Sequence, residues 1–312
     1  MSTHALDTAA FLSAFGAPQS DGAIISDEVA KFDFRYERLA PDERDAVILS
    51  VLDKIDGATL VGEHRHNIWE MAWSDVAKRY RETGDLSSLE PSFIGGSAYI
   101  RLIGDYARPL KEKFEFNYFR VLRTWLFRKF LADATHVYEF GCGSGFNLAA
   151  LAQMFPDKQL VGLDWATAAV DVINEFSGRF DFNLRGQRFN FFEPSASLEF
   201  GPKVAAMTFC ALEQTGERFK GFIDWLLEQK PGIVVSMEPT PEFYDANNLY
   251  DSLALRYHTK RQYLSGYYTY LRKLADEGKI DLIISRRLNM GSQFHEGYSL
   301  LVWRPRRGIE AS

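Results

Sequence analysis

The chain has 312 residues, of which 46% are hydrophobic and 25% charged, the composition of an ordinary soluble globular protein. A formal net charge of −6 disfavours a nucleic-acid partner, because phosphate binding needs a basic face. No run approaches about 18 apolar residues, and the first ten residues lack a signal-peptide pattern. We therefore expect a cytoplasmic protein with no membrane contact, long enough for one large α/β domain and an accessory segment of about 100 residues.

Helical patterns dominate the part of the chain before the first predicted strand. Pro41–Asp56 begins with proline and acidic residues, and its apolar residues recur at helical spacing. A second helix carries Trp69 and Trp73. A third helix, over residues 114–131, should lead into the first strand of a sheet.

A glycine turn is predicted within residues 137–147, which read Val-Tyr-Glu-Phe-Gly-Cys-Gly-Ser-Gly-Phe-Asn. A buried strand breaks there into a turn below a helix N-terminus, which brings backbone N–H groups close to a ligand. A dinucleotide fingerprint would need glycine at 146, where Phe146 stands. Glu139 precedes the turn and favours a ligand with an ammonium group over a pyrophosphate. The turn contains three alternating glycines: Gly141, Gly143 and Gly145.

A second strand, over residues 159–163, is followed by Asp164, roughly 20 residues past the turn, where an acid can accept both hydroxyls of a ribose. Together, Glu139-x-Gly-x-Gly-x-Gly and Gly162-Leu-Asp164 resemble the class I (Rossmann-like) S-adenosylmethionine (SAM)-dependent methyltransferases. The resemblance covers about residues 115–305. It implies an α/β fold with a seven-stranded, mostly parallel sheet and an antiparallel last strand, the cofactor S-adenosyl-L-methionine, and methyl transfer.

The resemblance also implies a division into two parts. Residues 1–112 would form an N-terminal helical cap that shapes the substrate region, and residues 113–312 the SAM-binding domain. The run His64-Arg65-His66 lies near the two tryptophans and suggests a polar and aromatic patch that faces the ligand. The alternative is a surface turn followed by a core helix that tryptophan anchors.

Polar side chains close five consecutive predicted strands. Ligands of doubly wound sheets bind at the carboxyl ends of the strands, so these side chains should share one edge. They are Glu139, Asp164, Asn190, Glu213 and Glu238. A metal site made of Glu213 and Glu238 is conceivable, but no short-spaced set of acidic ligands supports it, and two cysteines offer no zinc spacing. We predict no metal.

The cofactor site should combine the glycine turn with the ends of the next strands. In the resembling family the third strand commonly ends with an Asp, Asn or Glu and an apolar residue that hold the adenine, and Asn190 and Phe191 match that position. Trp165 can pack on the other face, although Phe191 or Phe192 can instead be a core aromatic. The predicted cofactor-binding residues are Glu139, Gly141, Cys142, Gly143, Gly145, Asn147, Asp164, Trp165, Asn190, Phe191 and Cys210.

Acceptor binding and proton removal are assigned to the strand ends and to the long insertion over residues 245–277. Basic residues and tyrosines cluster there, and the alternative is a solvated helix face. His258 is the predicted general base, because the unperturbed pKa of histidine lies nearest neutral pH, and Glu213 is the rival. The predicted substrate-binding residues are Glu238, Arg256, Tyr257, Arg261 and His295.

The predicted activity is methyl transfer to an oxygen or nitrogen of a small molecule, which can carry an anionic group. The chain lacks the Asn-Pro-Pro-Tyr type of motif after its fourth strand, and together with the acidic charge this absence favours a small-molecule substrate. One alternative is a non-catalytic protein of this fold that binds a partner through its cap. Another is an enzyme of related fold that uses decarboxylated SAM, like an aminopropyltransferase. A homodimer is left open.

Overall fold

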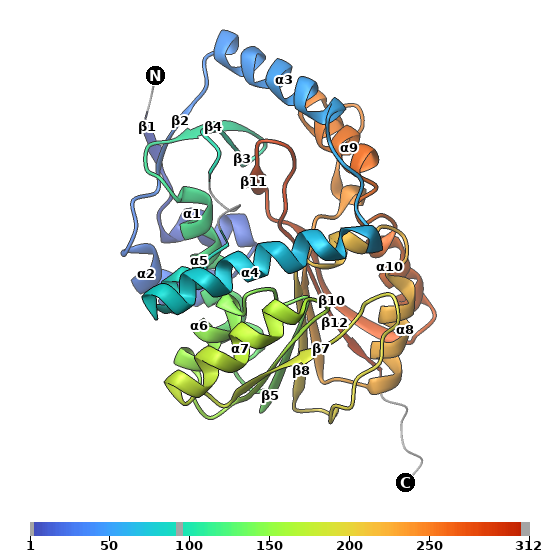
Figure 1. Ribbon diagram of the computed structural model, residues 1–312. Helices are drawn as coiled ribbons and strands as arrows, with labels where there is room; N and C mark the ends of the chain where they lie inside the picture. The colour runs from blue at the N-terminus through green and yellow to red at the C-terminus, as the bar shows by residue number, and fades with distance from the viewer. Residues whose placement is uncertain (1–2, 92–95, 307–312) are drawn as a thin grey trace.

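Two β-sheets and the helices packed around them make up the structure, a computed structural model that describes residues 3–91 and 96–306 (Figure 1). The larger sheet has seven strands in the order β10-β12-β9-β8-β5-β6-β7. Its strands are β5 (His136–Phe140), β6 (Gln159–Asp164), β7 (Leu184–Arg188), β8 (Val204–Phe209), β9 (Ile233–Met237), β10 (Ile280–Arg287) and β12 (Ser299–Pro305).

The pairing of the seven strands confirms the predicted sheet. Strands β5 to β9 pair in parallel with one another, whereas β12 is antiparallel to both β9 and β10. The polypeptide reaches β12 last, so the last strand is the antiparallel one. Because the parallel strands all point the same way, the residues that follow them meet at one edge of the sheet.

Helices cover both faces of this sheet, so its strands are apolar on both sides. Along β9, Val235 and Met237 belong to one core, whereas Val234 between them belongs to the other. The first core lies under α5, α6 and α7, and the second under α8 and α10. The bounds are α5 (Phe114–Phe130), α6 (Phe146–Met154), α7 (Thr167–Phe180), α8 (Lys220–Gln229) and α10 (Tyr267–Asp276).

The region before α5 contains the helices that the sequence predicted and also short strands that it did not. It contains α1 (Thr8–Phe15), α2 (Gly22–Val29), α3 (Pro41–Asp56) and α4 (His66–Thr83) together with four short strands. These strands are β1 (Thr3–Ala5), β2 (Arg35–Arg38), β3 (Ile100–Leu102) and β4 (Asp105–Pro109). Strands of three to five residues are too short to show a clear apolar alternation in sequence. The cap is therefore mixed α and β.

The cap sheet is completed by a strand from the other end of the chain. Its order is β1-β2-β4-β3-β11, and β11 (Met290–Ser292) lies in the connection between β10 and β12. One hydrophobic core also includes residues from both predicted parts, such as Phe11 of α1 and Val302 of β12. These contacts join the cap to the large sheet, and the predicted boundary near residue 112 stays a prediction.

Helix α3 and helix α9 (Leu249–Arg261) pack together beside the cap sheet (Figure 1). The apolar stripe predicted for α3 is buried against α9, where Val51 of α3 belongs to the same cluster as Tyr250 and Leu253. Five short 3-10 helices connect the elements: η1 (Gln19–Asp21), η2 (Glu63–Arg65), η3 (Leu86–Leu89), η4 (Leu212–Thr215) and η5 (Pro241–Phe243). Of these, η2 and η4 carry side chains of the candidate site.

Candidate active site

The glycine turn after β5 is bonded to the acid that ends β6. Oδ2 of Asp164 accepts the backbone N–H of Gly143 at 2.9 Å, and Oδ1 accepts that of Ala166 at 2.9 Å. Burial raises the pKa of Asp164 to about 6, although these backbone bonds oppose the shift. The turn depends on positive φ angles at its glycines, which are 71° at Gly141 and 74° at Gly145. The two predicted halves of the cofactor site are therefore in contact.

Glu139, on β5, has one oxygen bonded and one oxygen without a partner. Its Oε1 accepts a hydrogen bond from Nδ2 of Asn147 at 2.8 Å, whereas its Oε2 is buried and has no hydrogen-bond partner among the described residues. Burial raises the pKa of this carboxyl to about 8. A buried acceptor without a donor is costly, so the site fits a ligand that brings a cationic donor, such as the amino group of SAM.

Arg123 of α5 supports this carboxylate indirectly, and sequence reasoning missed it. Its guanidinium donates to Oδ1 of Asn147 at 3.2 Å and to the carbonyl oxygen of Phe146 at 3.2 Å. The bond to Oδ1 leaves the amide nitrogen of Asn147 to face Glu139. The local sequence of α5 does not distinguish Arg123 from the other basic residues of this helix.

A cavity of about 530 Å³ opens beside the turn and extends toward the cap. It is the size of many small-molecule sites. Its lining contains two groups of residues: the turn and its surroundings, represented by Glu139, Gly141 and Asn147, and a set from η2, η4, α9 and the segment after β11. The second group includes Arg65, Glu213, Tyr257, Arg261, Tyr263 and His295.

A smaller space of about 70 Å³ adjoins the first and is lined by aromatic rings. Asp164, Trp165 and Phe191 all line it, as the predicted nucleoside site requires. Asn190 does not, because it borders a separate hollow with Arg188, and its Oδ1 accepts the N–H of Phe192 at 3.0 Å within its own loop. The prediction for Asn190 is therefore not supported by its position.

Trp73 of the cap lies over the glycine turn. A Cβ atom placed on Gly143 would be 2.5 Å from its indole ring. Trp69 stacks on Trp73 with ring centroids 5.7 Å apart, and both line the two adjoining spaces. Trp73 also belongs to the main hydrophobic core and Trp69 packs against that core, as a core helix anchored by tryptophan would, so both interpretations of the cap tryptophans stay predictions.

Glu213 follows β8 and lines the 530 Å³ cavity. Hydrogen bonds connect it through Gln214 to Arg65. Oε1 of Glu213 accepts from Nε2 of Gln214 at 2.9 Å, and Oε1 of Gln214 accepts from Nη1 of Arg65 at 2.9 Å. Burial raises the pKa of Glu213 to about 7. A carboxyl with that pKa, at the edge of a ligand-sized space, is suited to accept a proton.

Glu238 lies below this cavity rather than in its wall. It is fully buried, and its two oxygens accept the backbone N–H groups of Ala211 at 3.2 Å and Glu213 at 3.4 Å. This position does not support the predicted role in substrate binding; Glu238 instead holds the backbone that carries Glu213. Cys210, at the same loop, lines both spaces with a φ of 52° and lies with its Sγ 3.4 Å from the carbonyl oxygen of Gly297.

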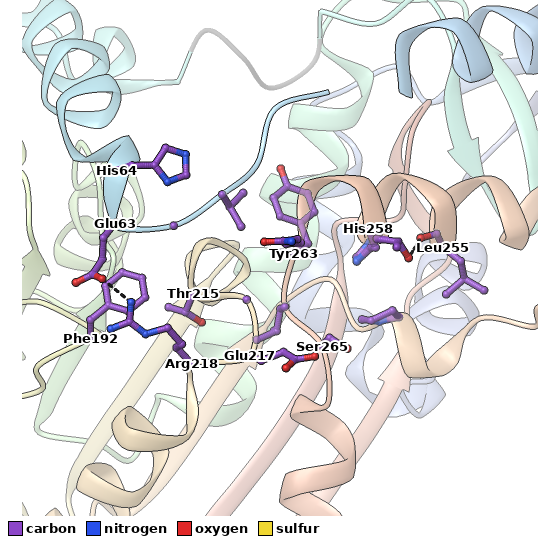
Figure 2. A pocket seen from close by; sticks show the side chains of 17 residues that line it. Glu63, His64, Phe192, Thr215, Glu217, Arg218, Leu255, His258, Tyr263 and Ser265 are labelled. Carbon is purple, nitrogen blue, oxygen red and sulfur yellow. Dashed lines mark hydrogen bonds and ion pairs between the residues drawn. The ribbon is translucent and has the colours of Figure 1, made fainter. Parts of the chain in front are cut away.

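His258 is buried between two cavities, as Figure 2 shows for the outer one. The outer cavity, of about 950 Å³, is lined by His258 and Tyr263 and bordered by the ion pair of Glu63 and Arg218. Nε2 of His258 lies 3.1 Å from Nδ1 of His295, which lines the inner cavity. Burial lowers the pKa of His258 to about 3, so it is not the base of near-neutral pKa that the sequence suggested.

The remaining predicted substrate residues divide by helix face. Tyr257 and Arg261 of α9 and His295 line the 530 Å³ cavity, a position consistent with their predicted role. Arg256 is exposed on the other side of α9 and lines neither this cavity nor the outer one. This position does not support its predicted role in substrate binding, and the arginine that lines the cavity together with Arg261 is Arg65 of the cap.

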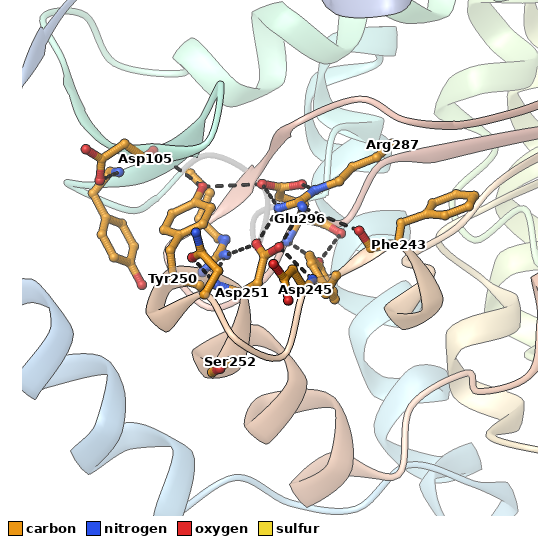
Figure 3. Close-up of polar contacts among 12 residues, drawn as sticks. Asp105, Phe243, Asp245, Tyr250, Asp251, Ser252, Arg287 and Glu296 are labelled. Atoms are coloured by element: carbon orange, nitrogen blue, oxygen red, sulfur yellow. Dashed lines mark hydrogen bonds and ion pairs between the residues drawn. The ribbon is translucent and has the colours of Figure 1, made fainter.

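A buried ionic network holds α9 against the segment after β11 (Figure 3). Arg287 donates to Asp251 at 2.8 and 2.6 Å and to Glu296 at 2.9 and 2.5 Å. Arg101 of β3 donates to the carbonyl oxygen of Tyr250 at 2.7 Å and lies 3.6 Å from Asp251. Arg101 is 149 positions from Tyr250 in the chain, and Asp251 is 36 positions from Arg287, so sequence reasoning could not connect them.

Neither a metal cluster nor a membrane-spanning helix occurs within residues 3–91 and 96–306. No group of three or more His, Cys, Asp or Glu side chains there is arranged to hold a metal ion. No helix in the same ranges has the length and apolar character needed to cross a bilayer.

Comparisons with known proteins identify the fold. No protein-family model matches the chain, and no curated protein matches its sequence significantly. Among solved structures, the (4+2)-cyclase SpnF matches over 80% of this chain and 98% of its own, with 12% identity and a TM-score of 0.51.

Two methyltransferases match with lower scores. A geranyl diphosphate C-methyltransferase from Streptomyces coelicolor A3(2) aligns over 75% of this chain and 98% of its own, at 13% identity and a TM-score of 0.45. The O-methyltransferase NcsB1 from neocarzinostatin biosynthesis aligns over 62% of this chain and 58% of its own, at 15% identity and 0.42. The chain thus spans less than two thirds of NcsB1. Strand order, glycine turn and the match to SpnF together show that the chain has the Rossmann-like α/β fold that its resemblance to class I methyltransferases predicted.

Proposed function

We propose that this chain is a SAM-dependent methyltransferase that acts on a small molecule. One observation carries the proposal: the buried Oε2 of Glu139 has no partner among the described residues and lies at the same strand edge as Asp164 and the glycine turn. A ligand with a cationic amine at one end and a ribose at the other would satisfy both acids. SAM has that chemistry, and it would supply a sulfonium methyl carbon open to in-line displacement.

The contribution of the chain is to bind, to align and to take a proton. Glu139 and Asp164 would fix the two ends of the cofactor, with Trp165 and Phe191 beside the adenine. The acceptor would lie in the part of the 530 Å³ cavity lined by Glu213. Alignment accounts for much of the rate in a displacement of this kind.

Glu213 is the proposed proton acceptor. When an acceptor hydroxyl or amine attacks, its oxygen or nitrogen would gain a bond to the methyl carbon as the bond from that carbon to sulfur breaks, and the proton that the acceptor loses would pass to the carboxylate of Glu213. The pKa of about 7 leaves a large ionised fraction near neutral pH. Burial lowers the pKa of His258 and of His295, so both rings stay neutral near neutral pH. Their role is therefore to pack beside the cavity rather than to accept the proton.

A second candidate function follows from the match to SpnF. That protein is a cyclase, so the fold does not by itself require methyl transfer. In that case the chain would use the same cavity for another reaction. A non-catalytic role and aminopropyl transfer from decarboxylated SAM are two further candidates. A cytoplasmic location and a homodimer stay predictions.

The test is methyl transfer itself. The full chain would be incubated with methyl-labelled SAM and fractionated pools of small metabolites, and formation of S-adenosylhomocysteine and of labelled product would be measured. We expect product with the wild type, much less with Glu213→Gln, and unchanged amounts with Arg256→Gln as the matched surface control. Tight SAM binding with no labelled product from any pool would contradict the proposal and favour another use of the fold.

A further inference from the structure

Two arginines on the acceptor side of the 530 Å³ cavity lie without a counter-charge bonded to them among the described residues. Arg65 comes from η2 of the cap and Arg261 from the last turn of α9. Both Nε atoms are buried and have no hydrogen-bond partner in the described part of the chain. The polar contact of Arg65 is to a neutral amide, that of Gln214 at 2.9 Å.

Aromatic rings lie beside both guanidinium groups. Arg65 lies 5.3 Å from the ring centroid of Trp69, and Arg261 lies 4.7 Å from that of Tyr263 and 5.6 Å from that of Tyr257. Rings of this kind attract a cation but leave its charge uncompensated. The pKa of Arg65 is lowered by burial and, after that, by the charge of Arg261, so the two cations act on each other.

The fully buried Arg101 and the half-buried Arg287 provide the contrast. Arg287 has both Asp251 and Glu296 as ion-pair partners, and Arg101 lies 3.6 Å from Asp251. Within residues 3–91 and 96–306, neither Arg65 nor Arg261 forms an ion pair. Both side chains are half-buried with a buried, unbonded Nε. Charges removed from water are generally paired in proteins, so an anionic ligand is the partner that these two arginines lack.

The charge of Glu213 interacts with those of both arginines, but Glu213 is not their ion-pair partner. It is hydrogen-bonded to Gln214 rather than to either guanidinium. Its pKa of about 7 means that it carries only part of a charge near neutral pH. The partial negative charge of Glu213 does not cancel the two positive charges of Arg65 and Arg261, so this side of the 530 Å³ cavity keeps a net positive charge.

We propose that the acceptor carries an oxyanion, a carboxylate or a phosphate, which Arg65 and Arg261 bind together while its apolar body lies among Tyr257, Tyr263 and Phe294. This inference rests on the proposed function, since it names the class of molecule that the same cavity would take. It also assigns a role to η2: the cap supplies one of the two arginines, and the binding site is incomplete without it. Arginine suits this role, because its fork of donors matches two oxygens of one anion.

The test compares matched ligands on the full chain. A panel of aryl and short alkyl carboxylates would be measured against primary amides of the same shape, and aryl phosphates against the parent phenols. Calorimetry and thermal shift would be run with and without saturating S-adenosylhomocysteine. We expect at least one acid or phosphate to bind roughly tenfold or more tightly than its neutral partner, the effect of charge-assisted hydrogen bonds. The carboxylate and phosphate arms distinguish the two anions.

Variants assign the effect to residues. Arg65→Gln and Arg261→Gln should each reduce the preference for the acid, and the double variant should abolish it. Arg261→Lys should keep part of it. Arg256→Gln removes the same charge from an exposed position on the same helix and should change nothing.

Two results would overturn the inference: no anion that binds better than its neutral partner, or a preference that survives in the double variant. Binding of S-adenosylhomocysteine is measured separately in the same samples. If S-adenosylhomocysteine does not bind to the wild type, the proposed function is contradicted. Normal cofactor binding without any preference for anions contradicts only the acceptor assignment.

Discussion

The indole ring of Trp73 occupies the space that a side chain on Gly143 would need, with 2.5 Å between the ring and an added Cβ atom. Gly143 also has a φ of 52°, donates its N–H to Asp164 and lines the 530 Å³ cavity. Cap and cofactor turn are thus fitted to each other. This contact makes the cap part of the proposed cofactor site.

Gly143→Ala should therefore weaken cofactor binding and destabilise the fold. The left-handed backbone alone costs roughly 1–2 kcal/mol for a residue with a Cβ, and the tryptophan must also move. Thermal unfolding and calorimetry with S-adenosylhomocysteine measure the two effects. Gly178→Ala is the matched control: this glycine lies in α7 with nothing within 4 Å of an added Cβ, so alanine should be neutral or stabilising. Equal cofactor affinity in both variants would argue against the fit.

The two rival bases make different predictions. Glu213→Gln should reduce kcat by about 10²–10⁴-fold and remove a kinetic pKa near 7 from the profile of kcat/KM, whose rate rises with pH as the carboxyl ionises. His258→Asn should leave the rate within about threefold, because the pKa of His258 is about 3 and the ring is neutral throughout the working range. The reverse pattern would assign the proton to the histidine.

Cofactor binding should release a proton through Glu139. In the ligand-free fold its pKa is about 8, so at pH 7 the carboxyl is mostly protonated. A bound ammonium favours the carboxylate and drives the proton off. Calorimetry at pH 7 in buffers of different ionisation enthalpy should detect about one proton released by the wild type and none by Glu139→Gln. No buffer dependence in the wild type would contradict the assignment.

The same shift sets a pH dependence of stability without ligand. The folded pKa of Glu139 lies above its usual value of 4.5, so the folded state holds the proton more tightly than the unfolded chain does. Its contribution is fully present below about pH 4.5 and is lost as the pH rises through about 8. The melting temperature of the wild type should fall over that window, and that of Glu139→Gln should fall less. A parallel decline in both would exclude this carboxyl as a cause.

Removing Arg287 from its ionic network should strongly destabilise the fold. Arg287→Gln leaves the buried acids Asp251 and Glu296 without their main partner, and breaking such a pair costs about 3–5 kcal/mol. Urea unfolding measures the loss. Arg286→Gln, at the exposed neighbouring position, should stay within about 0.5 kcal/mol. If the two variants unfold alike, the network contributes nothing specific.

Features that are local in sequence could be predicted. The bounds of α3 agree with those expected from the sequence, and β6 extends one residue beyond the expected 159–163, because a proline start and an apolar run are visible within one element. The contact of the glycine turn with Asp164 is also predictable, because neighbouring parallel strands end at one edge of the sheet. Tertiary context decides the rest.

His258 shows why other features of the site could not be predicted from the sequence. Its sequence neighbours are basic residues and tyrosines, but the pKa depends on burial against His295, which is 37 positions away. Likewise, the choice of Arg65 over Arg256 depends on which side of α9 meets the cap. The short cap strands pair with β11 from the far end of the chain, and no local pattern signals that pairing.

The central claim is that the site binds SAM. Calorimetry of the full chain with SAM, S-adenosylhomocysteine and NAD tests it most directly, with Asp164→Ala and the exposed control Asp171→Ala. We expect micromolar-class affinity for the first two ligands and no measurable binding of NAD. Asp164→Ala should weaken binding by about 1.5–3 kcal/mol through the loss of charge-assisted hydrogen bonds, while Asp171→Ala leaves it unchanged. Binding of NAD, or equal SAM affinity in the wild type and Asp164→Ala, would contradict the account.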